Sequence, residues 1–96
     1  MKVVYTELFA SKVGRLGNEP KGPLKEAVEM IIKNPGGYDG KHRYPWPGCF
    51  EKKVGPYRIV YGICGECRKQ GFGSQHTECS GYGDDTIVFR TAYVMF

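Results

Sequence analysis

The chain has 96 residues, a length that fits one folded domain with a single core. Hydrophobic residues make up 41% of it and aromatic residues 14%, enough apolar surface for a compact core. No apolar run reaches the length of about 18 residues that a membrane-spanning helix needs, so none is predicted. Glu7 interrupts the apolar stretch that a signal peptide would require, and we therefore expect a cytoplasmic protein.

The net charge of +4 is concentrated in the middle of the chain. Residues 34–63 carry five Lys or Arg against two Asp or Glu, whereas residues 64–96 carry three against four. A local excess of cations is typical of proteins that bind a polyanion such as RNA. The alternative is ordinary surface charge that keeps the protein soluble.

The first third of the chain predicts a strand and a short helix. Residues 2–6 are β-branched and aromatic, as in a strand. Phe9, Val13 and Leu16 follow at helical spacing. A loop is expected at residues 17–22, and the proline that follows this loop suits the first position of a second helix.

The second predicted helix, residues 24–33, has the clearest pattern. One apolar stripe at helical spacing is formed by Leu24, Ala27, Val28, Ile31 and Ile32. Asn34 and Pro35 end the helix, because the residue before a proline disfavours helical backbone. Residues 36–48, rich in glycine and proline, are predicted to form a loop.

The second half of the chain predicts three strands, at residues 49–54, 57–63 and 86–95. Between the last two lies an insertion, residues 64–85, which is rich in Cys, Gly and polar residues and cannot pack a core of its own. The order strand, helix, helix and three strands predicts an α+β domain. In it, two N-terminal helices cover one face of an antiparallel sheet.

Three cations lie close to the turn of the predicted hairpin: Lys52 and Lys53 on one strand and Arg58 on the other. Paired strands hold side chains in fixed directions, so such cations form a patch that suits phosphate binding. Neighbouring residues of a strand point to opposite faces, and only one of the two lysines can share a face with Arg58. The alternative for Arg58 is a structural arginine that pairs with a carboxylate across the sheet.

Two segments resemble the RelE/ParE superfamily of toxin–antitoxin systems. They are the helix that ends in Asn34-Pro35 and the run Phe-Glu-Lys-Lys-Val-Gly-Pro-Tyr-Arg-Ile-Val-Tyr at residues 50–61. That family has an amphipathic helix ending in Asn-Pro and then a hairpin of the type aromatic-Arg-x-Arg-Val-Gly-Asp-Tyr-Arg-x-x-Tyr. The resemblance covers residues 1–63 and resumes in the last strand. It implies that residues 1–96 form one RelE/ParE-like domain.

The resemblance implies a toxin with an antitoxin protein as its partner. RelE-type members are endoribonucleases that cut messenger RNA on the ribosome, whereas ParE-type members inhibit DNA gyrase and need no catalytic residues. Lys53 and Arg58 match the hairpin cations of the family, and Glu51 stands at its other cationic position. RelE-type enzymes also use basic, Tyr or His groups after the last strand, where this chain offers Arg90 and Tyr93.

Cleavage of RNA without a metal needs attack by the 2′-OH, stabilisation of charge on the phosphorane and a proton for the leaving 5′-oxygen. We predict that Arg58, Lys53 and Lys52 stabilise this charge. Glu51 or His42 is the predicted base, since histidine is suited to moving protons at neutral pH. The predicted RNA-binding residues are Lys41, His42, Arg43, Tyr44, Arg90 and Tyr93.

These assignments have plainer alternatives. His42 could be an ordinary surface histidine in a polar loop. Tyr44 and Trp46 could pin that loop to the core instead of contacting RNA. The whole domain could be a non-catalytic module that binds RNA, the ribosome or a protein, a class that includes ParE-like gyrase inhibitors.

The insertion contains the pattern C-x2-C-x8-H-x2-C, formed by Cys64, Cys67, His76 and Cys79. Two short-spaced ligand pairs suit a tetrahedral Zn²⁺ ion, and its binding would supply folding energy to a segment without a core. The pattern therefore predicts a structural zinc site. Hairpin pairing brings Cys49 close to Cys64, so Cys49 could replace His76 as a ligand. Disulfides and reduced thiols are the alternatives.

Overall fold

The structure, a computed structural model, describes residues 2–16, 18–42, 46, 48–71 and 81–94, with the backbone alone for residues 18–20. The elements in chain order are β1 (Val3–Tyr5), α1 (Glu7–Gly14), α2 (Asn18–Lys33), β2 (Gly40–His42), β3 (Cys49–Val54), β4 (Tyr57–Ile63), α3 (Cys64–Lys69) and β5 (Ile87–Val94). The predicted α+β class is confirmed. In this part of the chain, no helix is both long and apolar enough to cross a bilayer.

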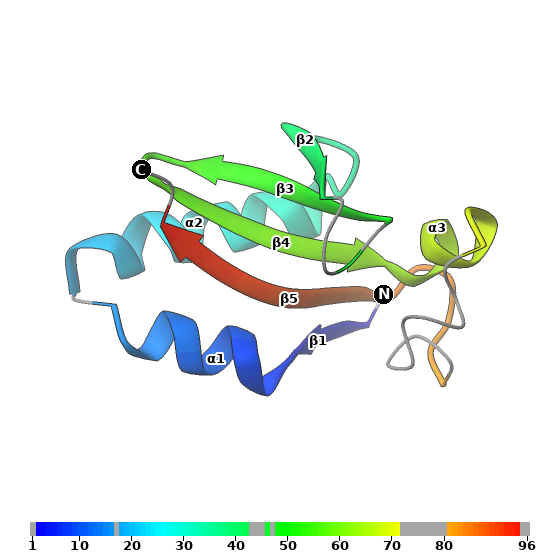
Figure 1. The fold of residues 1–96 in the computed structure, drawn as a ribbon, viewed down its shortest axis with the longest axis horizontal. Helices are drawn as coiled ribbons and strands as arrows, with labels where there is room; N and C mark the ends of the chain where they lie inside the picture. The colour runs from blue at the N-terminus through cyan, green and yellow to red at the C-terminus, as the bar shows by residue number, and fades with distance from the viewer. Residues whose placement is uncertain (1, 17, 43–45, 47, 72–80, 95–96) are drawn as a thin grey trace.

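The five strands form one sheet in the order β1-β5-β4-β3-β2 (Figure 1). β1 runs parallel to β5, and the other neighbouring strands are antiparallel. The sheet is therefore mixed, whereas the sequence predicted an antiparallel one. Strand propensity carries no direction, and this pairing joins Val3 to Ile87, residues from opposite ends of the chain.

α1 and α2 both pack on one face of the sheet. The core between helices and sheet consists of Phe9, Leu24, Ala27, Ile31, Phe50, Ile59, Tyr61, Ile87, Phe89 and Ala92. Each large apolar side chain buried there contributes about 1.5–3 kcal/mol of transfer free energy. Thr6 fixes the start of α1, because its Oγ1 accepts from the amide of Phe9 at 3.1 Å and donates to the carbonyl of Phe89 at 2.9 Å. This hydroxyl thus ties the first helix to the interior strand β5.

Three elements differ from the sequence prediction. α2 begins at Asn18, so Pro23 lies inside the helix and not at its first position. β2 forms in the predicted loop because residues 40–42 pair with β3. A segment of three residues is too short to show the alternating pattern that predicts a strand. α3 forms in the insertion, where the backbone amide of Gly65 donates to the carbonyl of Asp84 at 2.9 Å. A Cβ atom at residue 65 would lie 2.7 Å from that oxygen, so the contact requires glycine.

The face of the sheet turned away from α1 and α2, which we call the outer face, is left without a helix layer along most of its length. α3 lies at the end of the sheet away from the β3–β4 turn, near the start of β5 (Figure 1). Side chains alternate along a strand, so residues next to core positions belong to the outer face. In β3 and β4 these are the residues that flank Phe50 and Tyr61.

Candidate functional site

A row of three polar side chains crosses the outer face. Lys53 on β3 lies directly opposite Arg58 on β4, and Arg58 lies opposite Tyr93 on β5. Residues opposite each other on neighbouring strands share a face, so these side chains are neighbours. The Arg58 guanidinium donates to the carbonyl of Tyr57 at 3.2 Å. Within the described residues no carboxylate forms an ion pair with it, which disfavours a purely structural arginine.

A glutamate lies at the centre of the outer face and joins two further polar side chains. Oε2 of Glu51 lies 2.6 Å from Nδ1 of His42, and Oε1 accepts a hydrogen bond from the hydroxyl of Tyr93 at 3.0 Å. Both carboxylate oxygens are therefore engaged, and the three groups hold one another in place. The side chains of His42 and Glu51 are 11% and 22% exposed. His42, Glu51 and Tyr93 form a hydrogen-bonded chain beside the cations.

His42, the histidine of this hydrogen-bonded chain, is oriented through one ring nitrogen only. The contact between Nδ1 of His42 and the carboxylate of Glu51 orients the ring and leaves Nε2 as its other nitrogen. Nε2 is buried and makes no hydrogen bond within the described part of the chain. The arrangement resembles a catalytic acid–base pair, in which a carboxylate sets the tautomer of the ring.

Tyr93, the tyrosine of this hydrogen-bonded chain, stays protonated around neutral pH. Burial, followed by the hydrogen bond to Glu51 and the negative charge of Glu51, raises the pKa of Tyr93, while the charge of Arg58 opposes this effect. The phenol thus donates a hydrogen bond to the carboxylate. RNA binding was the role predicted for Tyr93 from the sequence, and the position of its hydroxyl beside Glu51 suggests a role in proton transfer as well.

Two lysines predicted for the site lie elsewhere. Lys52 points toward the helices, where its ammonium donates to the carbonyl of Gly37 at 3.1 Å and lies 3.8 Å from Asp39. Lys41 is paired with the core residue Phe50 and so belongs to the same side of the sheet. Strand alternation separates both lysines from Lys53, and the structure brings neither into the row.

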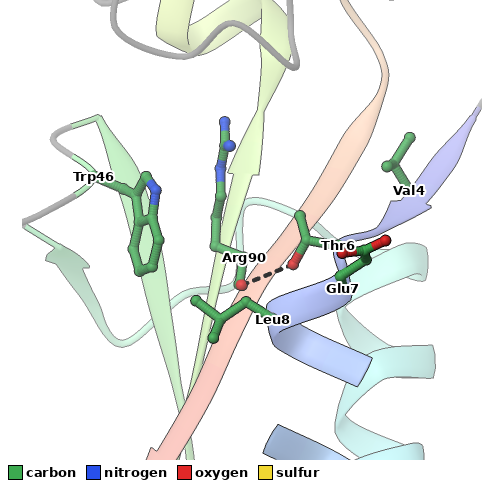
Figure 2. A pocket seen from close by; sticks show the side chains of 6 residues that line it. All are labelled: Val4, Thr6, Glu7, Leu8, Trp46 and Arg90. Atoms are coloured by element: carbon green, nitrogen blue, oxygen red, sulfur yellow. Dashed lines mark hydrogen bonds between the residues drawn. The ribbon is translucent and has the colours of Figure 1, made fainter. Parts of the chain in front are cut away.

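Arg90 enters the outer face through an irregularity in β5. The pairing with β4 moves from Phe89 to Thr91 and skips Arg90, whose side chain is 1% exposed. It lines a pocket of about 450 Å³ together with Val4, Thr6, Glu7, Leu8 and Trp46 (Figure 2). The sequence pointed to Arg90 but gave no signal for the residues around the start of α1. Their position beside β5 depends on the β1–β5 pairing.

Three cysteines gather at the end of the sheet near α3. Cys49, Cys64 and Cys67 are each fully buried. A Cβ atom on Gly62 would lie 3.1 Å from the sulfur of Cys49 and 3.6 Å from that of Cys67, so these two sulfurs converge over one glycine. Among the described residues, no three Cys, His, Asp or Glu side chains form a group that could hold a metal ion.

Four of the predicted site residues lie outside the described residues. Two are the predicted metal ligands His76 and Cys79, and two are the predicted RNA-binding residues Arg43 and Tyr44. The zinc site therefore stays a prediction, and so does the contribution of residues 43 and 44.

Solved structures that match this architecture include a RelE toxin and two toxin–antitoxin complexes. The isolated RelE toxin of E. coli superposes with a TM-score of 0.66 at 16% identity, over 99% of this chain and 84% of that one. The chain has a RelE-like toxin fold. This fold also matches the intact E. coli RelBE toxin–antitoxin complex, with a TM-score of 0.65 at 16% identity over 99% of this chain and 96% of that one.

A mycobacterial structure also matches this fold. The RelBE2 toxin–antitoxin complex of Mycobacterium tuberculosis matches with a TM-score of 0.66 at 18% identity, over 97% of this chain and 88% of that one. In sequence comparisons, no family model and no curated protein matches the chain. The RelE-like fold agrees with the resemblance carried by the second helix and the hairpin, and at these identities the likeness concerns the fold alone.

Proposed function

We propose that this protein is the toxin of a toxin–antitoxin pair and acts in the cytoplasm as an endoribonuclease that cuts messenger RNA at the ribosome. Support comes from the RelE-like fold, since the similar solved structures are a RelE toxin and two toxin–antitoxin complexes. An antitoxin protein is accordingly the proposed partner, and ribosome-bound RNA the proposed substrate. The net charge of +4 suits both a polyanionic substrate and an acidic inhibitor.

One observation carries the catalytic part of the proposal. Glu51 bonds both His42 and Tyr93 on the same face as the Lys53–Arg58 pair. Phosphoryl chemistry on RNA needs fixed positive charge at the phosphate and a route for protons between two oxygens. The outer face offers both within a few side chains.

The cations would hold the scissile phosphate. Arg58 can contact two phosphate oxygens at once, and Lys53, which is exposed and directly opposite, adds a point charge. Negative charge grows on the phosphate oxygens as the 2′-oxygen attacks, so these contacts strengthen in the transition state. Interactions that strengthen there accelerate the reaction instead of only binding the substrate.

The hydrogen-bonded chain would move the protons. The 2′-OH gives its proton to the His42–Glu51 pair while the 2′-oxygen bonds to phosphorus. The bond from phosphorus to the 5′-oxygen breaks, and Tyr93 donates its proton to that oxygen. The Nδ1 proton of His42 then passes through Glu51 to the phenolate over the 3.0 Å contact, and proton exchange with solvent returns the ring of His42 to its starting tautomer. The products are a 2′,3′-cyclic phosphate and a 5′-OH.

The two adjacent lysines of β3 provide a matched test of this site. Lys53 shares the face of Arg58, whereas Lys52 points toward the helices. Lys53→Ala and Arg58→Ala should each relieve growth inhibition and lower the rate of RNA cleavage by about 10²-fold or more. Lys52→Ala removes the same charge and should leave cleavage nearly unchanged.

The proposal is overturned if folded Arg58→Ala and Lys53→Ala proteins cleave RNA as fast as the unaltered protein. Growth inhibition that persists without cleavage would instead indicate a non-catalytic toxin of the same fold. Circular dichroism and thermal unfolding of each variant keep loss of activity separate from loss of structure.

We further propose that the cysteine-rich segment holds a structural zinc ion. The three buried cysteines at the end of the sheet supply thiolate donors, which suit Zn²⁺. Cys64 and Cys67 would be ligands, with Cys79 and His76, or Cys49 in place of His76. Such an ion would stabilise the segment between β4 and β5 and take no part in RNA cleavage.

A further inference from the structure

Asp39, the residue directly before β2, is bonded to the backbone of β3 at two residues of the candidate site. Its backbone amide donates to the carbonyl of Glu51 at 2.9 Å. Its carboxylate accepts a hydrogen bond from the backbone amide of Lys53, with Oδ2 2.7 Å from that nitrogen. Glu51 and Lys53 are the two residues that β3 contributes to the outer face beside Arg58, and one aspartate therefore holds the backbone of both.

The side chain of Asp39 takes the place of a strand partner for Lys53. β2 pairs with residues 49–51 of β3, so in the described part of the chain no β2 residue lies opposite Lys53. The edge of a sheet presents unpaired backbone amides where its neighbour ends. Because Oδ2 of Asp39 accepts from the amide of Lys53, the bonding along this edge continues to that residue. Lys53 is thus held on one side by Asp39 and on the other by its pairing with Arg58.

The charge of Asp39 works against the site, whereas its geometry supports it. The hydrogen bond from the amide of Lys53 is the largest cause that lowers the pKa of Asp39, burial opposes it, and the charges of nearby cations lower the pKa further. Asp39 is therefore ionised at neutral pH, and two of those cations are Lys53 and Arg58. A negative charge beside them repels a phosphate. A benefit from Asp39 must then come from where it holds β3.

We propose that Asp39 is a positioning residue for RNA cleavage and acts by fixing the backbone from which Lys53 projects. The inference rests on the proposed function, because it concerns the cation that Lys53 presents to the scissile phosphate. The lysine side chain is long and flexible, so a fixed backbone limits the positions that its ammonium can reach. A misplacement of about 1 Å can cost up to about 10²-fold in rate.

Two substitutions of Asp39 separate geometry from charge. Asp39→Asn removes the charge but keeps an oxygen that can accept from the amide of Lys53, whereas Asp39→Ala removes both. Asp39→Ala should lower kcat by about tenfold. Asp39→Asn should retain most of kcat and lower KM, because a charge that repels the substrate is gone. Equal losses of kcat in the two variants, or a folded Asp39→Ala protein with the native kcat, would overturn the proposal.

A double-mutant cycle tests whether Asp39 acts through Lys53. In the Lys53→Ala protein the cation is already missing, so adding Asp39→Ala should lower kcat by less than about twofold more. Two losses that multiply would indicate a general structural role and overturn the proposal. Asp39 also lies 3.8 Å from the ammonium of Lys52. In the Lys52→Ala protein, Asp39→Ala should still lower kcat by about tenfold, and disappearance of the effect there would assign it to Lys52 instead.

Asp84→Ala is the matched control. Asp84 is likewise an exposed aspartate paired with a cation, Arg68, but it lies against α3 and not beside the row. Its substitution should leave kcat unchanged, and a tenfold loss there would overturn the proposal. Thermal unfolding of every variant confirms that it is folded. RNA cleavage that requires Arg58 but not Asp39 would overturn this inference alone, whereas RNA left uncut by the native protein would overturn the proposed function and the role of Asp39 with it.

Discussion

Glu51→Gln isolates proton transfer from packing, because it removes the charge and keeps the shape. In the native protein both carboxylate oxygens accept, one from His42 at 2.6 Å and one from Tyr93 at 3.0 Å. The glutamine oxygen can still accept from the histidine, and its amide can donate to the phenol oxygen. Both contacts survive in altered form, so we expect the free energy of unfolding to fall by no more than about 1 kcal/mol.

The effect on catalysis should be far larger. An amide cannot take up a proton, so the path between His42 and Tyr93 is broken. General acid–base catalysis contributes about 10²–10⁴-fold, and the rate of RNA cleavage should fall by this factor. The change also removes a negative charge close to Arg58, so RNA binding should not weaken. The loss therefore belongs in kcat and not in KM.

A spectroscopic measurement checks the same contact without substrate. Burial is the largest cause that raises the pKa of Tyr93, and the hydrogen bond to Glu51 and the charge of Glu51 raise it further. In Glu51→Gln this pKa should fall. Alkaline absorbance titration of the variant, compared with Glu51→Gln/Tyr93→Phe, isolates this phenol from the other six of the seven tyrosines.

Glu29→Gln, on the exposed side of α2, is the control for loss of one negative charge. It should change neither the cleavage rate nor the titration of Tyr93. The proposed proton transfer through Glu51 is refuted if Glu51→Gln folds normally and cleaves RNA at the native rate. An equal fall in the cleavage rate of Glu29→Gln would mean that the change in net charge, and not the loss of proton transfer through Glu51, is responsible.

Two further predictions concern stability. Burial, aided by the charges of Tyr38 and Asp39, raises the pKa of Tyr61 from 10.0 to about 12. The protonated phenol therefore stabilises the fold fully below pH 10, and this stabilisation is lost as the pH rises through 12. Relative to Tyr61→Phe, the native protein should lose up to roughly 3 kcal/mol of unfolding free energy over that range. At neutral pH the Tyr61→Phe variant should be about 1 kcal/mol less stable, because it lacks the 2.6 Å hydrogen bond from the phenol to the carbonyl of Pro35. Equal dependence of the unfolding free energy on pH in the two proteins would contradict this account. The zinc proposal predicts about one equivalent of zinc in purified protein, and a lower melting temperature after chelation; metal-free protein with unchanged melting in EDTA would refute it.

Local patterns were sufficient to predict the elements with regular spacing. The apolar stripe of α2 predicted core positions, and Leu24, Ala27 and Ile31 are buried there. The β3–β4 hairpin forms with Val54 opposite Tyr57, as its turn residues indicate. Helical spacing and turn chemistry act between residues that are close in sequence, and the chain alone therefore specifies them.

The sequence determined the residue types of the site and the rule that only one of Lys52 and Lys53 can share a face with Arg58, and the structure shows that this residue is Lys53. The tertiary structure alone decided that Glu51 meets His42 and Tyr93, which come from β2 and β5. β2 has too few residues to show a pattern, and β5 joins the sheet between β1 and β4. Which strands become neighbours depends on the burial of the whole sheet, and no local spacing records it.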